Sequence, residues 1–246
     1  MNTRRRQQEK EITKAADDQF NSRADRDETR VVMVIGSGWN PGLIGLTAGR
    51  LCERYHRPSI ALSLSGDVAT GSCRSIPGVH IFRMLQACGD LLERFGGHAQ
   101  AAGLTVRRDR LRDFYGRLNR VIRESCDPAC FEPVQEYDLA LPFSVWTPET
   151  LEKLSLLEPT GEGNPAPCFL LPDVSVQSMR KVGRDQSHLQ MTLLAGRTVL
   201  KGIAFSQGDA ADRPLPDADL LYTPTVNRFN GRTSIEAQVL AINECN

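Results

Sequence analysis

The segment VVMVIGSGWNPG, residues 31–42, decides the fold of the first half of the chain. Its first five residues are apolar and mostly β-branched, which is typical of a buried strand. The sequence GSGWN then forms a turn, and Pro41 stands where the first turn of a helix tolerates proline. The segment therefore predicts a strand, a turn and the beginning of a helix.

Outward from this segment, helical and extended patterns alternate up to residue 132. Apolar residues recur at helical spacing, or in short runs that suit strands. Helices are expected at 42–55, 82–95 and 111–125, and strands at 31–35, 59–62, 69–74 and 101–106. Gly96 and Gly97 are expected to end the second of these helices. The alternation predicts an α/β domain over residues 31–132, a sheet with flanking helices.

Residues 1–30 have a different character from the domain that follows. Residues 2–20 read as a polar helix whose apolar stripe is thin, comprising Ile12, Ala15, Ala16 and Phe20. Such a helix buries little by itself, so we expect it to lean on another element. Residues 21–30 are polar and read as a linker.

A third pattern begins near Asp127-Pro128 and covers residues 133–246. Thr147 caps a short helix whose leucines, up to Leu156 and Leu157, are expected to pack inward. About five short strands follow, and Asn230-Gly231 is a hairpin signal. Five strands with one helix predict an all-β OB-fold barrel.

Composition excludes several classes of protein. Net charge is zero, with 30 Lys+Arg and 30 Asp+Glu, so the basic surplus of many nucleic-acid proteins is absent overall. No apolar run approaches the ~20 residues of a membrane span, and the charged N-terminus does not read as a signal peptide. The seven cysteines are scattered without a Cys-x-x-Cys pair, which argues against a zinc site and a disulfide framework and favours a reducing cytoplasm.

The first candidate site is GSCRS, residues 71–75. Arg74 has the side chain best shaped for bidentate contact with a phosphate, and the hydroxyls of Ser72 and Ser75 add donors. The alternative is an ordinary ion pair of an arginine at a strand end.

The second candidate is the turn Gly96-Gly97-His98. Paired glycines let backbone amides approach an anion, and His98 can donate to phosphate or relay a proton. The alternative is a helix C-cap followed by a solvated histidine. Residues 101–103, Ala-Ala-Gly, are better explained by tight packing.

Other patterns carry less chemistry. The glycines of residues 36–42 have the wrong spacing for a dinucleotide fingerprint, so a nicotinamide enzyme is disfavoured. Asp217 and Asp219 read as a solvated turn rather than a metal pair. No cluster of Asp and His that would hold catalytic metals is visible, so no metal ligand is assigned in this chain.

In the barrel half, five basic residues stand out near predicted turns, where OB-folds present nucleic acid to strands and loops. They are Arg180, Lys181, Arg184, Arg228 and Arg232. Phe205, Tyr222 and Phe229 are candidates for stacking on bases. For Phe205 and Tyr222 the core is the favoured place.

Read together, these segments resemble the RecJ-like single-stranded-DNA-specific exonucleases of the DHH phosphoesterase superfamily. The resemblance covers nearly the whole chain and is carried by the following motifs: WNPGLIG at 39–45, GSCRS at 71–75, LERFGGH at 92–98, GEGNPAP at 161–167, His188-Leu189, Ala204-Phe205, and NRF-x-G at 227–231. Asn40 departs from the pattern, since relatives often carry His after the Trp.

The resemblance implies a domain order: a DHH domain with Asp and His ligands for Mn²⁺ or Mg²⁺, a long connecting helix, a DHH-associated domain and an OB-fold. This chain resembles the C-terminal half, with residues 1–30 as the connecting helix and linker. It contains no Asp-His-His. It is therefore expected to bind no metal and to be inactive alone, with hydrolysis requiring a DHH domain elsewhere.

The resemblance also implies roles. Ser72, Arg74, Ser75 and Gly96 to His98 would face the 5′-terminal phosphate, with His98 as a candidate accessory group, and the barrel would grip single-stranded DNA. The implied activity is that of a 5′→3′ exonuclease in DNA repair and recombination. Implied partners are 5′-ended single-stranded DNA and a single-stranded-DNA-binding protein, a helicase or a separate DHH domain. The alternative is a non-catalytic binding or interaction module.

Overall fold

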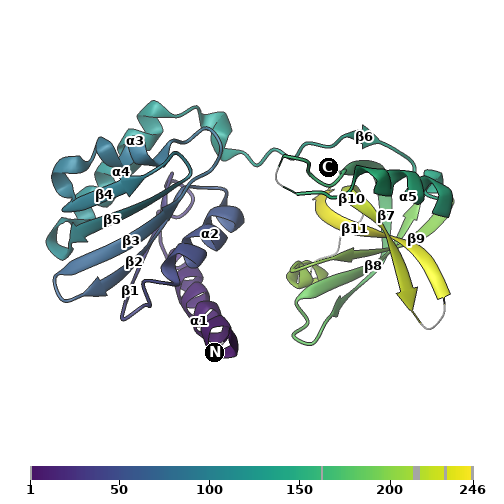
Figure 1. Ribbon diagram of the computed structural model, residues 1–246, viewed down its shortest axis with the longest axis horizontal. Helices are drawn as coiled ribbons and strands as arrows, with labels where there is room; N and C mark the ends of the chain where they lie inside the picture. The colour runs from purple at the N-terminus through teal and green to yellow at the C-terminus, as the bar shows by residue number, and fades with distance from the viewer. Residues whose placement is uncertain (1, 162, 213–216, 230–231, 245–246) are drawn as a thin grey trace. The chain divides into compact units, whose positions relative to one another are not determined.

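The computed structural model describes residues 2–161, 163–212, 217–229 and 232–244. The chain divides into two compact units, Met1–Val134 and Gln135–Asn246, and each is described by itself (Figure 1).

The first unit is built on a five-stranded mixed sheet. Its strands are β1 (Val32–Ser37), β2 (Ser59–Ser65), β3 (Val68–Arg74), β4 (Arg94–Gly97) and β5 (Ala101–Arg107). They lie in the order β1-β2-β3-β5-β4, in which β1 and β2 are parallel and the other pairs antiparallel. The helices are α1 (Asn2–Asn21), α2 (Ile44–Tyr55), α3 (Ile81–Gln86) and α4 (Leu111–Ser125).

Helices cover the two faces of this sheet unequally. On one face, apolar residues of β2, β3 and β5 pack under α3 and α4 in one core that includes Leu62, Cys73, Leu104 and Phe114. On the other face a smaller core joins α1 and α2 to β1 and β2. Because side chains alternate along a strand, the β3 and β5 residues that point away from α3 and α4 are polar or small except Val68, and many stay accessible.

Helix α1 leans on the sheet as expected. Ala16 and Phe20 are fully buried, and Phe20 meets the ring of Tyr55 edge-on at 4.6 Å between centroids. The Gln19 side-chain amide also accepts from the Ile35 N–H at 2.7 Å and donates to the Ile35 C=O at 3.0 Å. The helix is therefore fastened to the exposed edge of β1.

The expectation of one helix over 82–95 was wrong. Helix α3 ends at Gln86, a 3₁₀ turn follows at Gly89–Leu91, and Arg94–Gly97 is strand β4. The segment pairs with β5, with Gly96 opposite Gly103 and Gly97 opposite Ala102. Gly96 and Gly97 thus lie in a strand rather than at a helix end, because antiparallel pairing with β5, the next strand along the chain, outweighed the local helical pattern.

The second unit contains a closed five-stranded barrel. Its strands are β7 (Phe169–Val182), β8 (His188–Ala195), β9 (Thr198–Ala204), β10 (Asp217–Phe229) and β11 (Arg232–Glu244), and short β6 (Leu139–Ala140) adds to β7. The order is β7-β8-β9-β11-β10, and β10 pairs back to β7. Only β9 and β11 are parallel within the barrel. The predicted fold class, an α/β domain followed by a β-barrel, is confirmed.

The helix before the barrel, α5 (Pro148–Leu154), begins with a capping box between Thr147 and Thr150. Leu154 packs against the barrel core, but Leu156 is 82% exposed and Leu157 is 50% exposed. The expectation that both pack inward was wrong, because a 3₁₀ turn at Ser155–Leu157 ends the helical spacing. The hairpin signal Asn230-Gly231 lies outside the described residues. No helix in the described part of the chain is long and apolar enough to cross a membrane.

A part-buried hydrogen bond helps to tie the segment before α5 to the barrel core. Trp146 donates from Nε1 to the Tyr222 hydroxyl at 2.6 Å, and Tyr222 is completely buried. Burial raises the pKa of Tyr222, so its hydroxyl stays neutral at ordinary pH.

Tyr222→Phe should lower the free energy of unfolding of the barrel unit by about 1 kcal/mol, because the Trp146 N–H loses its acceptor. Urea unfolding followed by circular dichroism measures this loss. Tyr137→Phe is the matched control, since Tyr137 is half exposed. Equal stability of the Tyr222→Phe variant and the wild type would contradict the role given to this bond.

Candidate nucleic-acid interface

Strand register brings the two sequence-predicted motifs together. Arg74, the last residue of β3, lies opposite Ala101 of β5. The Ser75 N–H donates to the Gln100 C=O at 2.9 Å, and the His98 N–H donates to the Ala101 C=O at 2.7 Å. The GSCRS segment and the turn between β4 and β5 therefore lie side by side.

The Arg74 guanidinium is held in a defined place. Its Nη1 donates to the Cys73 C=O at 2.8 Å and to the Ser72 Oγ at 3.3 Å. The side chain is half-buried, and no carboxylate forms an ion pair with it among the residues that the structure describes. The expected alternative, an ordinary ion pair, is thus not seen in the described part of the chain.

Helix α2 approaches this guanidinium at its N-terminal end. A Cβ added to Gly45, the second residue of α2, would lie 3.2 Å from the Ser72 Oγ and 3.4 Å from the Arg74 Nη2. The N-terminal end of a helix carries partial positive charge. A cation without an acidic partner beside a second positive source creates a potential that attracts an anion.

Ser72 and Ser75 differ in availability. Ser72 lies on the same face of β3 as Arg74 and is partly accessible. The Ser75 hydroxyl donates to the Val79 C=O at 2.7 Å, within the loop that follows β3. Ser72 is therefore the hydroxyl that accompanies the guanidinium, while Ser75 stabilises the loop.

The glycines in and around this turn differ in whether the fold requires glycine at their positions. Gly97 has a φ of +148°, and a Cβ there would collide with the backbone of Ala101 and Ala102. Gly96 has nothing within 4 Å of a Cβ, and at Gly103 the nearest atom is the Gly71 O at 3.7 Å. Gly97 is needed by the fold, whereas the tight packing expected at Gly103 is not found. The His98 side chain is exposed.

Cys73, between Ser72 and Arg74, points to the opposite face of the sheet and is completely buried. Burial raises the pKa of the Cys73 thiol to about 12, which leaves no thiolate for nucleophilic attack at neutral pH. The groups on the accessible face are instead those of Arg74, Ser72 and the turn of His98, which are suited to binding an anion.

The described residues contain no cluster of metal ligands. No group of three or more His, Cys, Asp or Glu in that part of the chain could hold a metal ion. Asp217 and Asp219 lie in β10 rather than in a turn, and the Asp219 carboxylate accepts from the Asp173 N–H at 3.1 Å. The residues described do not fit a divalent metal centre, and no step through one is assigned to them.

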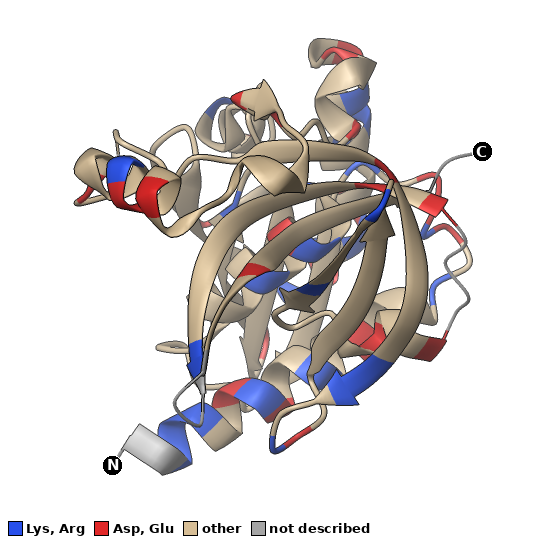
Figure 2. Cartoon of the chain, turned by 90° about the vertical axis from the view of Figure 1, so that its right-hand side faces the viewer, with Lys and Arg blue, Asp and Glu red and all other residues tan. Residues whose placement is uncertain are grey.

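In the barrel, the basic residues near the turn between β7 and β8 have local partners. Arg180 donates from Nε to the Gln190 Oε1 at 2.7 Å, and Lys181 forms an ion pair with Asp212 at 2.8 Å. Arg184 is exposed in the turn itself. Figure 2 shows that Lys and Arg positions alternate with Asp and Glu positions along the described chain.

Arg228 and Arg232 lie at the other end of the barrel. Strand β11 runs parallel to β9, so the β10–β11 turn lies at the end where β9 begins, and the β7–β8 turn lies where β9 ends. Arg228 is exposed; the side chain of Arg232 lies outside the described residues. The predicted basic residues therefore form two groups, one at each end of the strands.

The outer face of β8 and β9 lies between these two groups. Exposed Lys201 is opposite Thr192 in the register, and Arg197 occupies the turn between the two strands. Phe205 follows β9, is 52% exposed and meets the His188 ring edge-on at 5.2 Å. The strand alternation from Val199 to Phe205 was the signal that could have placed Lys201 and Phe205 on this face.

Of the three aromatic candidates, Tyr222 lies in the core, as expected. Phe205 does not, because it falls in the outward series of β9 and extends beyond the last paired residue, Ala204. The side chain of Phe229 lies outside the described residues.

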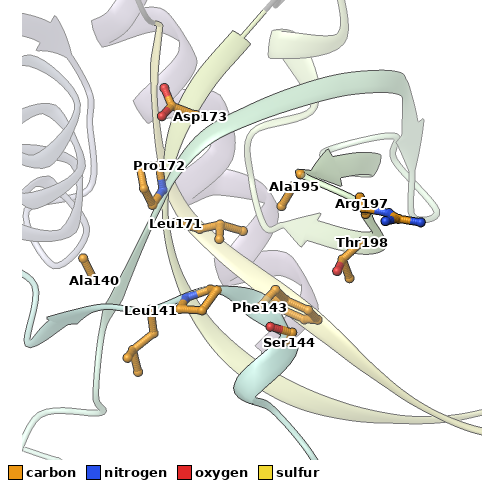
Figure 3. A pocket seen from close by; sticks show the side chains of 12 residues that line it. Ala140, Leu141, Phe143, Ser144, Leu171, Pro172, Asp173, Ala195, Arg197 and Thr198 are labelled. Atoms are coloured by element: carbon orange, nitrogen blue, oxygen red, sulfur yellow. The ribbon is translucent and has the colours of Figure 1, made fainter.

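A cavity of about 570 Å³ lies at one end of the barrel. Leu171 and Phe143 lie at its centre, while the Asp173 and Arg197 side chains point away from them (Figure 3). A ligand site needs polar groups that converge on the cavity. This cavity therefore lacks the converging polar groups of a ligand site.

Comparison with known proteins agrees with the two units. The family model of the DHHA1 domain matches residues 27–124, and that of the RecJ OB domain matches residues 137–241. The single-stranded-DNA-specific exonuclease RecJ of Bacillus subtilis is 33% identical over 210 residues, 84% of this chain and 27% of the relative. The Escherichia coli protein of the same name is 32% identical over 205 residues, 80% of this chain and 35% of the relative.

Solved structures give the same result. The crystal structure of RecJ from Thermus thermophilus in complex with Mg²⁺ superposes with a TM-score of 0.77 at 28% identity, and the complex with Mn²⁺ with a TM-score of 0.78. They cover 100% of this chain, which covers 36% and 35% of them. The chain thus spans about a third of the length of its relatives. It consists of a DHHA1 domain followed by a RecJ OB domain, the C-terminal pair of domains that it shares with the RecJ single-stranded-DNA-specific exonucleases.

Proposed function

We propose that this chain binds single-stranded DNA by its 5′-terminal phosphate, as the substrate-holding part of a RecJ-type 5′→3′ exonuclease in DNA repair and recombination. The observation that carries the proposal is the half-buried Arg74, held beside Ser72 and the first turn of α2 without an acidic partner among the described residues.

The chemistry of this site suits a terminal phosphate. A guanidinium binds two phosphate oxygens in parallel, and the Ser72 hydroxyl adds a donor. A terminal phosphomonoester carries close to two negative charges at neutral pH, more than the single charge of an internal diester. The His98 ring, exposed at the neighbouring turn, serves as an additional donor or proton relay.

The barrel supplies the second contact with the strand. Nucleic acid would cross the outer face of β8 and β9, the face that OB-folds commonly use. Phe205 would stack on a base there, while Lys201 and the exposed Arg184 and Arg228 would meet phosphates.

Hydrolysis is assigned to the complete RecJ-type protein. Relatives solved with Mg²⁺ or Mn²⁺ indicate that a divalent metal serves that protein, and the described residues of this chain do not fit one. The proposed partners are single-stranded DNA and a separate DHH domain, a helicase or a single-stranded-DNA-binding protein. The free thiols of the described cysteines suit a reducing cytoplasm.

Arg74→Ala should abolish the preference for a 5′ phosphate. A hydrogen bond to a charged group contributes roughly 1.5–3 kcal/mol, so the Kd for 5′-phosphorylated oligothymidylate should rise about 10- to 100-fold. The Kd for the 5′-hydroxyl oligonucleotide should change little. Fluorescence anisotropy with the two oligonucleotides at one salt concentration measures both values.

Arg120→Ala is the matched control for charge, because Arg120 is exposed on α4, the helix on the opposite face of the sheet. It should keep the phosphate preference. Equal affinity of the wild type for phosphorylated and unphosphorylated strands would refute the proposed phosphate site.

Phe205→Ala should weaken binding of phosphorylated and unphosphorylated strands alike, by about 1–3 kcal/mol if one base stacks on the ring. Tyr137→Ala removes an exposed aromatic ring from the segment before β6 and should have no effect. Unchanged affinity of the Phe205→Ala variant in the same anisotropy assay would exclude this face of β8 and β9 as the binding face.

Incubation of the purified chain with 5′-labelled single-stranded DNA and Mn²⁺ tests the assignment of hydrolysis. Binding without degradation is expected. Degradation by this chain would show that hydrolysis does not need further domains.

A further inference from the structure

Gly45, in the first turn of α2, differs from the other helical glycines in what surrounds it. The three nearest atoms outside α2 to a Cβ at Gly45 are side-chain atoms, the Ser72 Oγ and Cβ and the Arg74 Nη2, at 3.2 to 3.9 Å. No backbone atom is among these nearest neighbours. A side chain here would therefore press on the two groups of the phosphate site rather than on the frame of the domain.

Gly49, one turn further along α2, gives the contrast. Nothing lies within 4 Å of a Cβ at Gly49. Neither glycine has a φ in the left-handed region, so alanine fits the backbone at both positions. Alanine is also the better helix former. Helix formation thus gives no reason for glycine at position 45, whereas the clearance to Ser72 and Arg74 does.

The clearance has an electrostatic consequence. It lets the guanidinium lie against the first turn of α2, where the helix end is positive. The Arg74 guanidinium and the positive end of α2 repel each other when no anion is bound, and an anion close to both is attracted by both. Moving the guanidinium away from α2 would relieve that repulsion and weaken the attraction for the anion.

We propose that Gly45 is a positioning residue of the phosphate site. Because Gly45 has no side chain, Arg74 and Ser72 can occupy the positions in which they recognise a terminal phosphate. This inference rests on the proposed function and deepens it, since it concerns the preference for a 5′-phosphate and not binding of the strand as a whole. Gly45 acts through Arg74 and does not itself contact the strand.

The test uses Gly45→Ala and Gly45→Leu, with Gly49→Ala and Gly49→Leu as matched controls on the same helix. The measured quantity is the ratio of the Kd values for 5′-hydroxyl and 5′-phosphorylated oligothymidylate. Gly45→Ala should lower this ratio several-fold, and Gly45→Leu should bring it close to one. The Gly49 variants should keep the wild-type ratio. Thermal unfolding should show that Gly45→Ala folds as stably as the wild type.

A double-mutant cycle shows whether the effect passes through the guanidinium. In the Arg74→Ala background, Gly45→Leu should not change the ratio further. A wild-type ratio in Gly45→Leu, or an undiminished effect of Gly45→Leu without Arg74, would overturn the inference. A wild type without any phosphate preference would instead refute the phosphate site itself, so the two failures are distinguishable.

Discussion

Antiparallel pairing of β5 with both β3 and β4 is the constraint on which the rest of the first unit depends. It fixes which side chains of three strands share a face, and a slip of one residue would exchange the faces completely. In the observed register, Cys73 and Leu104 enter the core under α3 and α4, so Ser72 and Arg74 must point to the other side. The same pairing carries the turn of His98 up to Arg74. The packing of the core and the grouping of the residues of the proposed phosphate site thus both follow from the alternation of side chains along these strands.

Much of the fold could be predicted because its elements are marked locally. The apolar run 31–35 and the amphipathic spacing of 111–125 each indicate their own structure. Pro41 was expected in the first turn of a helix, but α2 begins only at Ile44. The segment 82–95 could not be read in this way, since Arg94–Gly97 is a strand only because β5 lies beside it. Leu156 and Leu157 were wrongly predicted to lie in the core, because α5 ends at Leu154 and a 3₁₀ turn follows, which the leucine-rich sequence does not indicate.

The residues of the candidate site likewise differ in how far the sequence alone could predict them. Arg74, Ser72 and His98 could be named from residue types, because their chemistry is visible in the sequence. The part proposed for Gly45 could not, since it depends on how close a Cβ at this position would come to the Ser72 Oγ and the Arg74 Nη2, 3.2 and 3.4 Å. Likewise, the five basic residues of the barrel looked like one set along the chain, and only the parallel pairing of β9 with β11 separates them into two ends.

The contact of Gln19 with Ile35 has a consequence for how this domain is delimited. The amide occupies the N–H and the C=O of Ile35 on the edge of β1 that faces away from β2, and so blocks part of the edge that another strand could pair with. The DHHA1 family model begins at residue 27, beyond α1. A fragment cut at that boundary would expose Val32 and Val34 together with an open strand edge, which favours self-association. Helix α1 therefore covers part of the edge and of one face of the sheet, and a domain boundary drawn at residue 27 would remove that cover.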